Sequence, residues 1–207
     1  MLGIFLPTWR VAVIVIVVSL QLAAPRLAAG DTYESGIAAL DAGRYDEALF
    51  HISLLAANDD PRAQYTMGVM YRQGLGVAQD DREALLWYLA AAEAGHMLGQ
   101  YAAGLAFDRG IGAGRDVGNA LHYLREAALQ GHAAAPVQIG AIHYLGTDID
   151  VDHVRAYFWW QIAADRNAPG AAQNMFRLKQ EISDQDLARA TTYLTSCQTK
   201  TLRQCVP

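Results

Sequence analysis

The chain has 207 residues, about the length of one domain, and carries a formal net charge of −5 at pH 7. Residues 1–30 hold Arg10 and Arg26 and none of the 21 acidic residues, so the rest of the chain has 14 basic residues and a net charge of −7. Affinity for nucleic acids requires a basic face that displaces counterions. The charge therefore argues against a general polyanion binder, and we expect no nucleic-acid partner.

Residues 1–30 have the pattern of a secretory signal peptide. Arg10 precedes VAVIVIVVSLQLAA, a mostly apolar stretch of 14 residues, and small residues follow at 28–30. We expect cleavage after Gly30 and export, to the bacterial periplasm or out of the cell. The alternative is an uncleaved anchor, although a spanning helix needs about 20 apolar residues. This segment is the only membrane contact that the sequence predicts.

From residue 61 onward the sequence repeats with a period of 36 residues. The same step links sets of glycines, aspartates, alanines and aromatic residues. The sets are Gly68, Gly104 and Gly140; Gly74, Gly110 and Gly146; Asp80, Asp116 and Asp152; Ala84, Ala120 and Ala156; and Trp87, Tyr123 and Trp159. Matches in register without an insertion indicate an array of structural repeats.

Each unit is predicted to contain two helices. In the first unit a helix is expected over 61–73, because its first residue is a proline and Gly74 follows its end. A second helix is expected to begin at Asp80, whose carboxylate caps the first turn, with Glu83 three positions later completing a capping box. Gly95 is the expected left-handed residue after this helix.

The small and aromatic positions of residues 63–98, which begin AQYTMGVMYRQGLGVAQDDREALLWYLAAAEAG, resemble the Sel-1-like repeat, a relative of the tetratricopeptide repeat. Residues 99–134 match well. Residues 135–170 match more loosely, since Asp148 and Asn167 stand at positions of glycine. The resemblance implies an all-α fold, a right-handed α-solenoid of antiparallel helix pairs.

Further stretches extend this pattern in both directions. The sequence GRYDEA at 43–48 resembles the turn inside a tetratricopeptide unit, and Ser183 with Asp186 forms another capping box at the start of a helix to about Cys197. We therefore divide the chain into the following parts: 1–30, signal peptide; 31–196, solenoid, with a capping helix pair at 32–60, repeats at 61–96, 97–132 and 133–168, and C-terminal capping helices at 169–196; and 197–207, C-terminal tail.

Both cysteines of the chain, Cys197 and Cys205, lie in the last eleven residues. In an exported protein such a pair favours a disulfide. We expect it to staple the C-terminus rather than to do redox chemistry, because the C-x-x-C spacing is absent. The alternative is two free thiols on a frayed tail.

Several patterns that suggest chemistry have a structural explanation within the repeat. The glycine turn at Gly74 recurs in successive units and lacks the residues of a phosphate-binding loop. Trp159 and Trp160 fall in the register of packing aromatics, with a stacking platform for a sugar or base as the alternative. His96 and His132 follow terminal glycines, which suggests a role in the turn. The histidines and cysteines are not clustered as in a zinc site. We expect no enzyme, metal or cofactor.

A binding surface is predicted on the first helix of each unit, which lines the concave face of such arrays. Its tyrosines, arginines and aliphatic residues have the composition of an interaction surface. The alternative is that some of the tyrosines pack between neighbouring helices. The predicted groove comprises Arg62, Tyr65, Val69, Arg72, Gln73, Tyr101, Leu105, Asp108, Arg109 and Tyr144, with Leu98, Val137, Ala141 and Leu145 in the same register and Tyr33 and Ile37 extending it.

The sequence thus predicts an exported, non-enzymatic scaffold that binds a protein or peptide partner. The family resemblance implies roles in cell-envelope assembly or regulation. A second hypothesis comes from secreted, cysteine-rich relatives of this repeat that bind or hydrolyse β-lactams. Those relatives carry a cysteine pair in each repeat, and no repeat of this chain contains a cysteine.

Overall fold

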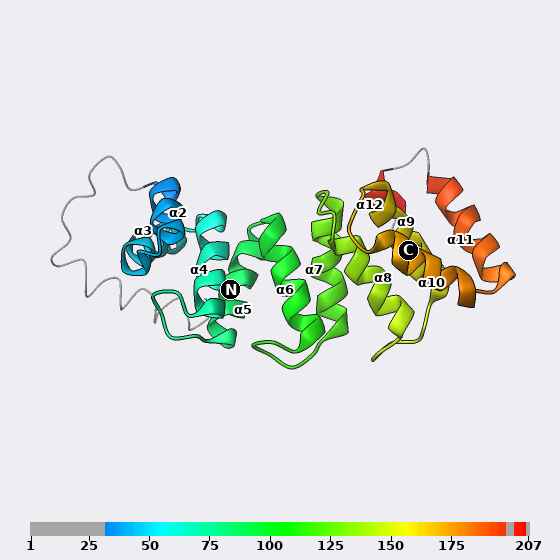
Figure 1. Ribbon diagram of the computed structural model, residues 1–207, viewed down its shortest axis with the longest axis horizontal. Coiled ribbons are helices and arrows are strands. Elements are labelled where there is room, and N and C mark those ends of the chain that lie inside the picture. Colours follow the sequence, from blue (N-terminus) through cyan, green and yellow to red (C-terminus); the bar gives the residue numbers. More distant parts are fainter. Residues whose placement is uncertain (1–31, 198–200, 206–207) are drawn as a thin grey trace, which may run out of the picture.

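The computed structural model describes residues 32–197 and 201–205, and the predicted signal peptide lies outside the described residues. The regular elements of the described part are helices that follow one another along the chain (Figure 1). They are α2 (Tyr33–Asp41), α3 (Tyr45–Ala57), α4 (Pro61–Gln73), α5 (Asp81–Glu93), α6 (Met97–Arg109), α7 (Val117–Leu129), α8 (Ala135–Leu145), α9 (His153–Asp165), α10 (Ala171–Glu181), α11 (Asp184–Cys197) and α12 (Leu202–Cys205).

Consecutive helices pack in pairs, and the pairs stack into an elongated array (Figure 1). The pairs are α2 with α3, α4 with α5, α6 with α7 and α8 with α9, and the second helix of each pair contacts the first helix of the next. Helix α4 also contacts α6 directly, which places first helices of neighbouring units on the same side. At the C-terminal end α10 and α11 both pack against α9. The prediction of an all-α repeat array is confirmed.

The first helix of each repeat ends at the predicted glycine. Gly74, Gly110 and Gly146 have φ angles of 70°, 68° and 61°, and each donates its N–H to a carbonyl of the last turn. This left-handed conformation is unfavourable for residues with a Cβ atom. The chain can therefore reverse within a few residues and return as the second helix.

The second helix of each repeat begins at the predicted aspartate. Asp80 accepts hydrogen bonds from two first-turn N–H groups at 2.9 and 3.1 Å, and Asp116 and Asp152 also cap their helices. The capping box was predicted only half correctly. The N–H of Asp80 donates to the carbonyl of Tyr71 at 3.0 Å, so it does not donate to the side chain of Glu83 as a capping box requires. The loop folds back against α4, where that carbonyl needs a donor.

Small residues allow the two helices of a repeat to approach closely. A Cβ atom on the central glycine of the first helix would lie 2.5–2.7 Å from a side-chain carbon of the second helix, which is inside van der Waals contact. The three pairs are Gly68 with Tyr88, Gly104 with Leu124 and Gly140 with Trp160. The period of 36 residues therefore reflects a repeated packing contact.

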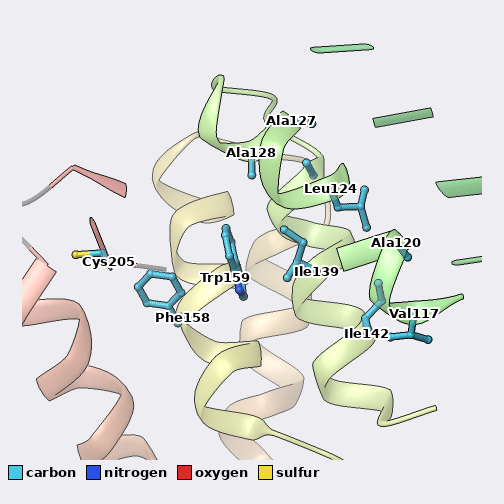
Figure 2. Packing of buried hydrophobic residues seen from close by; sticks show 11 residues of the cluster. Val117, Ala120, Leu124, Ala127, Ala128, Ile139, Ile142, Phe158, Trp159 and Cys205 are labelled. Carbon is cyan, nitrogen blue, oxygen red and sulfur yellow. The ribbon is translucent and has the colours of Figure 1, made fainter. Parts of the chain in front are cut away.

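A cluster of buried side chains joins α7, α8 and α9 (Figure 2). Leu124, Ile139 and Trp159 are at most 1% exposed, and Trp160 is 2% exposed with its Nε1 donating to the carbonyl of Val137 at 3.0 Å. The packing interpretation of the tryptophan pair is confirmed. The alternative prediction, that Trp159 and Trp160 form a stacking platform for a sugar or base, was wrong, because both rings are buried and a ligand cannot reach them.

The loop of repeat 3 departs from the glycine pattern for an electrostatic reason. Asp148 adopts a left-handed φ of 63° where glycine stands in the other repeats. Its carboxylate lies 2.5 Å from Nη1 of Arg115, whose Nε also donates to the carbonyl of Asp108 at 2.7 Å. Arg115 thus joins the loops of repeats 2 and 3.

The C-terminal helices begin at local caps. Helix α10 starts after Gly170, which has a φ of 81°, so Pro169 precedes the helix rather than opening it. Ser183 accepts a hydrogen bond from the N–H of Asp186 at 3.1 Å at the start of α11, as the sequence predicted.

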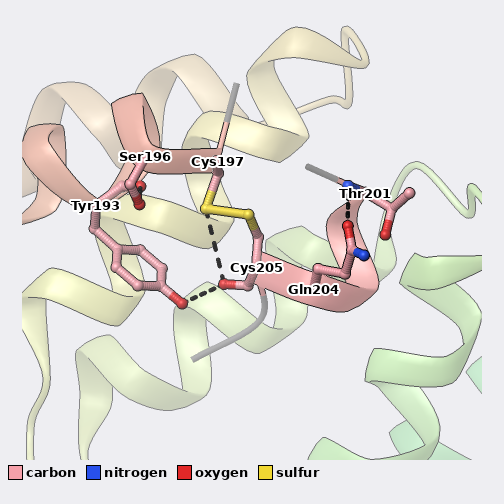
Figure 3. The surroundings of a disulfide bond; sticks show 6 residues. All are labelled: Tyr193, Ser196, Cys197, Thr201, Gln204 and Cys205. Atoms are coloured by element: carbon pink, nitrogen blue, oxygen red, sulfur yellow. Dashed lines mark hydrogen bonds between the residues drawn. A yellow bond between two sulfur atoms is a disulfide. The ribbon is translucent and has the colours of Figure 1, made fainter. Parts of the chain in front are cut away.

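The two cysteines form the predicted disulfide (Figure 3). Cys205 is 3% exposed and belongs to the cluster of α7, α8 and α9, so the tail is not frayed at this point. The Tyr193 hydroxyl donates to the carbonyl of Cys205, and Arg203 pairs with Glu126 of α7 at 3.0 Å. The disulfide therefore fixes α12 against the last repeat.

Candidate partner-binding surface

Two histidines sit where the first helices of repeats 2 and 3 begin. His96 is the N-cap of α6, and its Nδ1 accepts from the N–H of Gly99 at 3.2 Å. The Nδ1 of His132 accepts from the N–H of Ala135 at 3.2 Å, at the first residue of α8. A ring nitrogen accepts only when it carries no proton. Both imidazoles are therefore neutral in this arrangement, and the predicted role in the turn is confirmed.

Two tyrosines of the predicted groove lie against these histidines. The ring of Tyr65 is 5.4 Å from that of His96 and 5.8 Å from that of Tyr88, and the ring of Tyr101 stacks on His132 at 4.0 Å. Burial lowers the pKa of both histidines and raises the pKa of Tyr65 and Tyr101. All four rings are half-buried, so the tyrosines support the helix junctions and remain partly exposed to solvent.

Arg62 forms the charged N-terminal end of the surface. Its guanidinium lies 2.9 Å from Asp60 and 3.7 Å from Glu34, and it stands over the ring of Tyr33 at 4.6 Å. The hydrogen bond from Arg62 lowers the pKa of the Asp60 carboxyl, which also caps α4. The side chain of Arg62 is exposed but held in one direction by these contacts.

A cavity of about 120 Å³ lies where repeat 1 meets repeat 2. Arg72 and Arg109 contribute to its lining, and Arg72 pairs with Asp81 of α5 at 2.6 Å. Tyr88 and Leu105 supply apolar surface. The arrangement combines two guanidinium groups with an apolar wall, which suits a side chain that carries both an apolar stem and a negative charge.

The other candidates on α4 and α6 divide between exposed and packed positions. Gln73 is exposed, and Leu98 is exposed at the start of α6. Val69 packs against the cluster that includes Tyr88. Asp108 pairs with Arg115 at 3.2 Å. Its carboxylate therefore contributes to the loop contact as well as to the surface.

The candidates on α8 contact the C-terminal helices to different extents, and Leu145 is 65% exposed. The hydroxyl of Tyr144 donates to Glu181 of α10 at 2.7 Å, and its ring lies 5.3 Å from that of Trp160. Val137 and Ala141 pack against buried clusters that include residues of α9 and α10. The α8 part of the predicted groove therefore differs from α4 and α6 in that Tyr144 is tied to α10, although it stays partly exposed.

The periodicity alone could have indicated the histidines as neighbours of the groove tyrosines. His96 and His132 are one period apart, as are Tyr65 and Tyr101. Within residues 32–197 and 201–205, no group of three or more histidines, cysteines and carboxylates is placed to hold a metal ion. No helix in this same part of the chain is both long and apolar enough to cross a membrane.

The stacked helix pairs and their repeated glycine and aspartate positions define a helical repeat protein. The Sel1 repeat pattern matches residues 61–96, 98–132 and 135–167, and the chain belongs to the Sel1 repeat family. The three matched segments coincide with the helix pairs α4/α5, α6/α7 and α8/α9.

Two solved structures are similar to this chain. One is a Sel1 repeat protein from Oxalobacter formigenes, with 30% identity, a TM-score of 0.64 and coverage of 70% of this chain and 59% of that one. The other is a protective antigen present in uropathogenic Escherichia coli strains that displays an SLR fold, with 27% identity, a TM-score of 0.66 and coverage of 69% and 32%. The chain thus matches less than two thirds of either protein. No curated protein matches it.

Proposed function

We propose that the protein is an exported, non-enzymatic scaffold that binds a segment of a partner protein along α4 and α6. The cavity between repeats 1 and 2 carries this proposal. Arg72 and Arg109 flank it, and the partly exposed Tyr65 and Tyr101 lie on the same two helices. Arginine and tyrosine residues beside a small pocket are typical of the residues that dominate binding energy in protein interfaces.

The surface favours a partner segment with acidic and aliphatic side chains. Arg109 attracts a carboxylate beside the Arg72–Asp81 ion pair, and Leu105 and Tyr88 accept an apolar group. In repeat 3 the equivalent tyrosine, Tyr144, donates instead to Glu181 of α10. The proposed segment therefore spans repeats 1 and 2, where the two arginines border the cavity.

Crosslinking in the native compartment, followed by mass spectrometry, tests this proposal. We expect crosslinked peptides from α4 and α6, and we expect recovery of the partner to fall at least tenfold in the variant Arg72→Ala with Arg109→Ala. The loss follows from removing two charges at the centre of the surface. A matched control is Arg82→Ala, the same change at an exposed position of α5.

Equal recovery of the partner by the double variant and by the control would contradict the proposal that α4 and α6 bind the partner. Crosslinks confined to the second helices α5, α7 and α9 would also contradict this proposal. Thermal melts of each variant separate a binding defect from unfolding, since Arg72 and Arg109 are not buried.

The enzymatic alternative is tested on the purified protein with a chromogenic β-lactam. We expect no turnover above the uncatalysed rate. Turnover that is lost on mutating a residue of the surface would overturn the non-enzymatic proposal in favour of a hydrolase.

Export is supported by the disulfide between Cys197 and Cys205, because such bonds persist in oxidising compartments. We propose that the mature chain begins at Asp31 and works in the periplasm or outside the cell. Mass spectrometry of the protein isolated from its native compartment should give the mass of residues 31–207. An intact residue 1 would instead support a membrane anchor.

A further inference from the structure

Helix α10 has the sequence pattern of a first helix of the repeat. Its buried side chains lie three periods after buried side chains of α4. They are Ala171, Met175 and Leu178, which correspond to Ala63, Met67 and Met70. Helix α10 accordingly packs against α9, as each first helix of a repeat packs against the second helix before it.

The opposite face of α10 has lost the glycine that admits a second helix. Phe176 stands at this position, three periods after Gly68. In the repeats even a Cβ atom at this glycine would lie 2.5–2.7 Å from a side-chain carbon of the second helix, so a phenylalanine excludes a helix at that distance. Helix α11 packs against α9 instead, and Phe176 is 70% exposed. This face of α10 is therefore open.

A second open face lies on α3, toward the other end of the array (Figure 1). Phe50 is 51% exposed on this helix. Its equivalent three periods later, Phe158 of α9, is 1% exposed, and the ring of Tyr193 from α11 lies 5.2 Å from its ring. The outer side of a second helix can therefore receive a further helix at this position.

The charges beside the two phenylalanines are opposite. Residues 32–60 contain six acidic residues and one basic residue, a net charge of −5. Asp46 is exposed one turn before Phe50 on α3, and Lys179 is exposed one turn after Phe176 on α10. Charge complementarity of this kind steers association and fixes the orientation of the partners.

Antiparallel packing of the two faces satisfies both the aromatic and the charged groups. Side chains three or four positions apart share one face of a helix. When Phe50 lies opposite Phe176 in antiparallel helices, the turn before Phe50 lies opposite the turn after Phe176. Asp46 then meets Lys179, whereas Glu47 is already paired with the N-cap arginine of α3 at 3.0 Å. A parallel arrangement would separate the two charges.

We infer that α3 of one copy of the chain binds α10 of a second copy, with Phe50 against Phe176 and Asp46 against Lys179. Because each copy carries both faces, and the faces differ, the contact is heterologous. A copy that binds through α3 keeps its own α10 open for another copy. The protein therefore assembles head to tail through surfaces other than the one on α4 and α6.

Sedimentation velocity of the mature chain tests this inference. Two single helix faces make a small interface, so we expect the average mass to exceed that of the monomer only above about 100 μM, and less so at high salt. The variants Phe50→Gln and Phe176→Gln should each stay monomeric. An equimolar mixture of the two should form a dimer and no larger species, because each variant keeps one intact face.

The matched control is Val151→Gln, which removes a 56% exposed hydrophobic side chain outside both faces and should associate as the unmodified chain does. Thermal melts check that the phenylalanine variants stay folded. A monomer mass at every concentration, association of either phenylalanine variant alone, or no dimer in their mixture would each overturn the inference. The variant Arg72→Ala with Arg109→Ala should associate normally, so this test is independent of the proposed partner surface.

Discussion

Repeats 1 and 2 differ from repeat 3 in how each unit meets its neighbours. In the first two, Gly76 and Gly112 bring the loop against the preceding helix pair, and a Cβ at Gly112 would collide with the carbonyl of Asp81. Repeat 3 has Asp148 at this position, and its carboxylate pairs with Arg115 of the preceding loop. One kind of junction depends on a missing side chain and the other on an ion pair.

The same contrast appears on the inner side of the array. In repeats 1 and 2, Tyr65 and Tyr101 contact the histidine at the start of the first helix of the next repeat, and both tyrosines remain partly exposed. In repeat 3 Tyr144 instead donates to Glu181 of α10. A departure from the repeat pattern therefore marks the place where the neighbouring element changes from another repeat to the C-terminal helices.

The largest effect is expected where two helices of a regular repeat touch. Gly68→Leu places side-chain atoms inside the ring of Tyr88, since even a Cβ would lie 2.5 Å from it. We expect a loss of about 3 kcal/mol in the free energy of unfolding, at the upper end of overpacking costs. Chemical denaturation measures it. Gly114→Leu is the control, because a Cβ there meets no atom within 4 Å. Equal stability of the two variants would contradict the packing contact.

A slightly smaller effect is expected at the other end of the molecule. Replacing Cys197 and Cys205 together by serine removes the covalent link of α12 and leaves a hydroxyl at a buried position. The chain-entropy estimate for this short loop is about 2–3 kcal/mol. Urea denaturation of the double variant should show this loss, and dithiothreitol should lower the stability of the unmodified chain but not of the variant. If reduction does not change the stability of the unmodified chain, the disulfide does not stabilise the fold.

A moderate effect of pH is expected at the histidine junctions. Burial lowers the pKa of His96 and His132 in the folded chain below the ordinary value of 6.5. Folding therefore favours the neutral form, and its stabilisation is complete above about pH 6.5 and is lost as the pH falls from there towards the folded-state pKa. His143, with a pKa of about 4, contributes in the same direction.

Melting temperatures measured between about pH 7 and pH 5 test this expectation. Asparagine also caps helices but does not titrate in this range. The variant His96→Asn with His132→Asn should therefore lose less stability on acidification than the unmodified chain, with the remaining loss due in part to His143. An identical pH dependence of the two proteins would show that the junction histidines do not sense pH.

The smallest effect is expected from the ion pairs of the repeat 3 loop. Arg115→Ala removes the contacts with Asp108 and Asp148, which lie near the surface. Such pairs contribute about 0.2–1 kcal/mol each, less at high salt. We expect a loss of about 1 kcal/mol in low salt that shrinks in 1 M NaCl. A loss that does not depend on salt would indicate packing by the arginine stem instead.

The helices of the repeats could be predicted closely because their signals are local. The expected helix over 61–73 has the same bounds as α4, and Asp80 caps α5 as predicted. A cap, a terminating glycine and an aromatic position each depend on residues a few positions apart. Recurrence every 36 residues then separated these structural roles from chemical ones.

The candidate surface could be predicted only as a set of positions. The register placed Tyr65, Tyr101 and Tyr144 on equivalent faces, but it did not show that Tyr144 donates to Glu181 of α10 or that Arg72 and Arg109 border one cavity. The burial of His143 was not predicted at all. The sequence shows His143 at a position that is aromatic in the other repeats. Its burial beside Arg125 and Arg155 depends on how α7, α8 and α9 meet.

The sequence by itself therefore determined the repeating helix pair, its caps and the close contact at Gly68 and its equivalents. Tertiary structure alone decided which faces stay open. Tyr144 and Glu181 are 37 residues apart, and Glu126 and Arg203 are 77 apart, so no local pattern connects them. The contact of Tyr144 with α10 and the burial of Cys205 arise from such distant contacts, because burial depends on which elements meet in space.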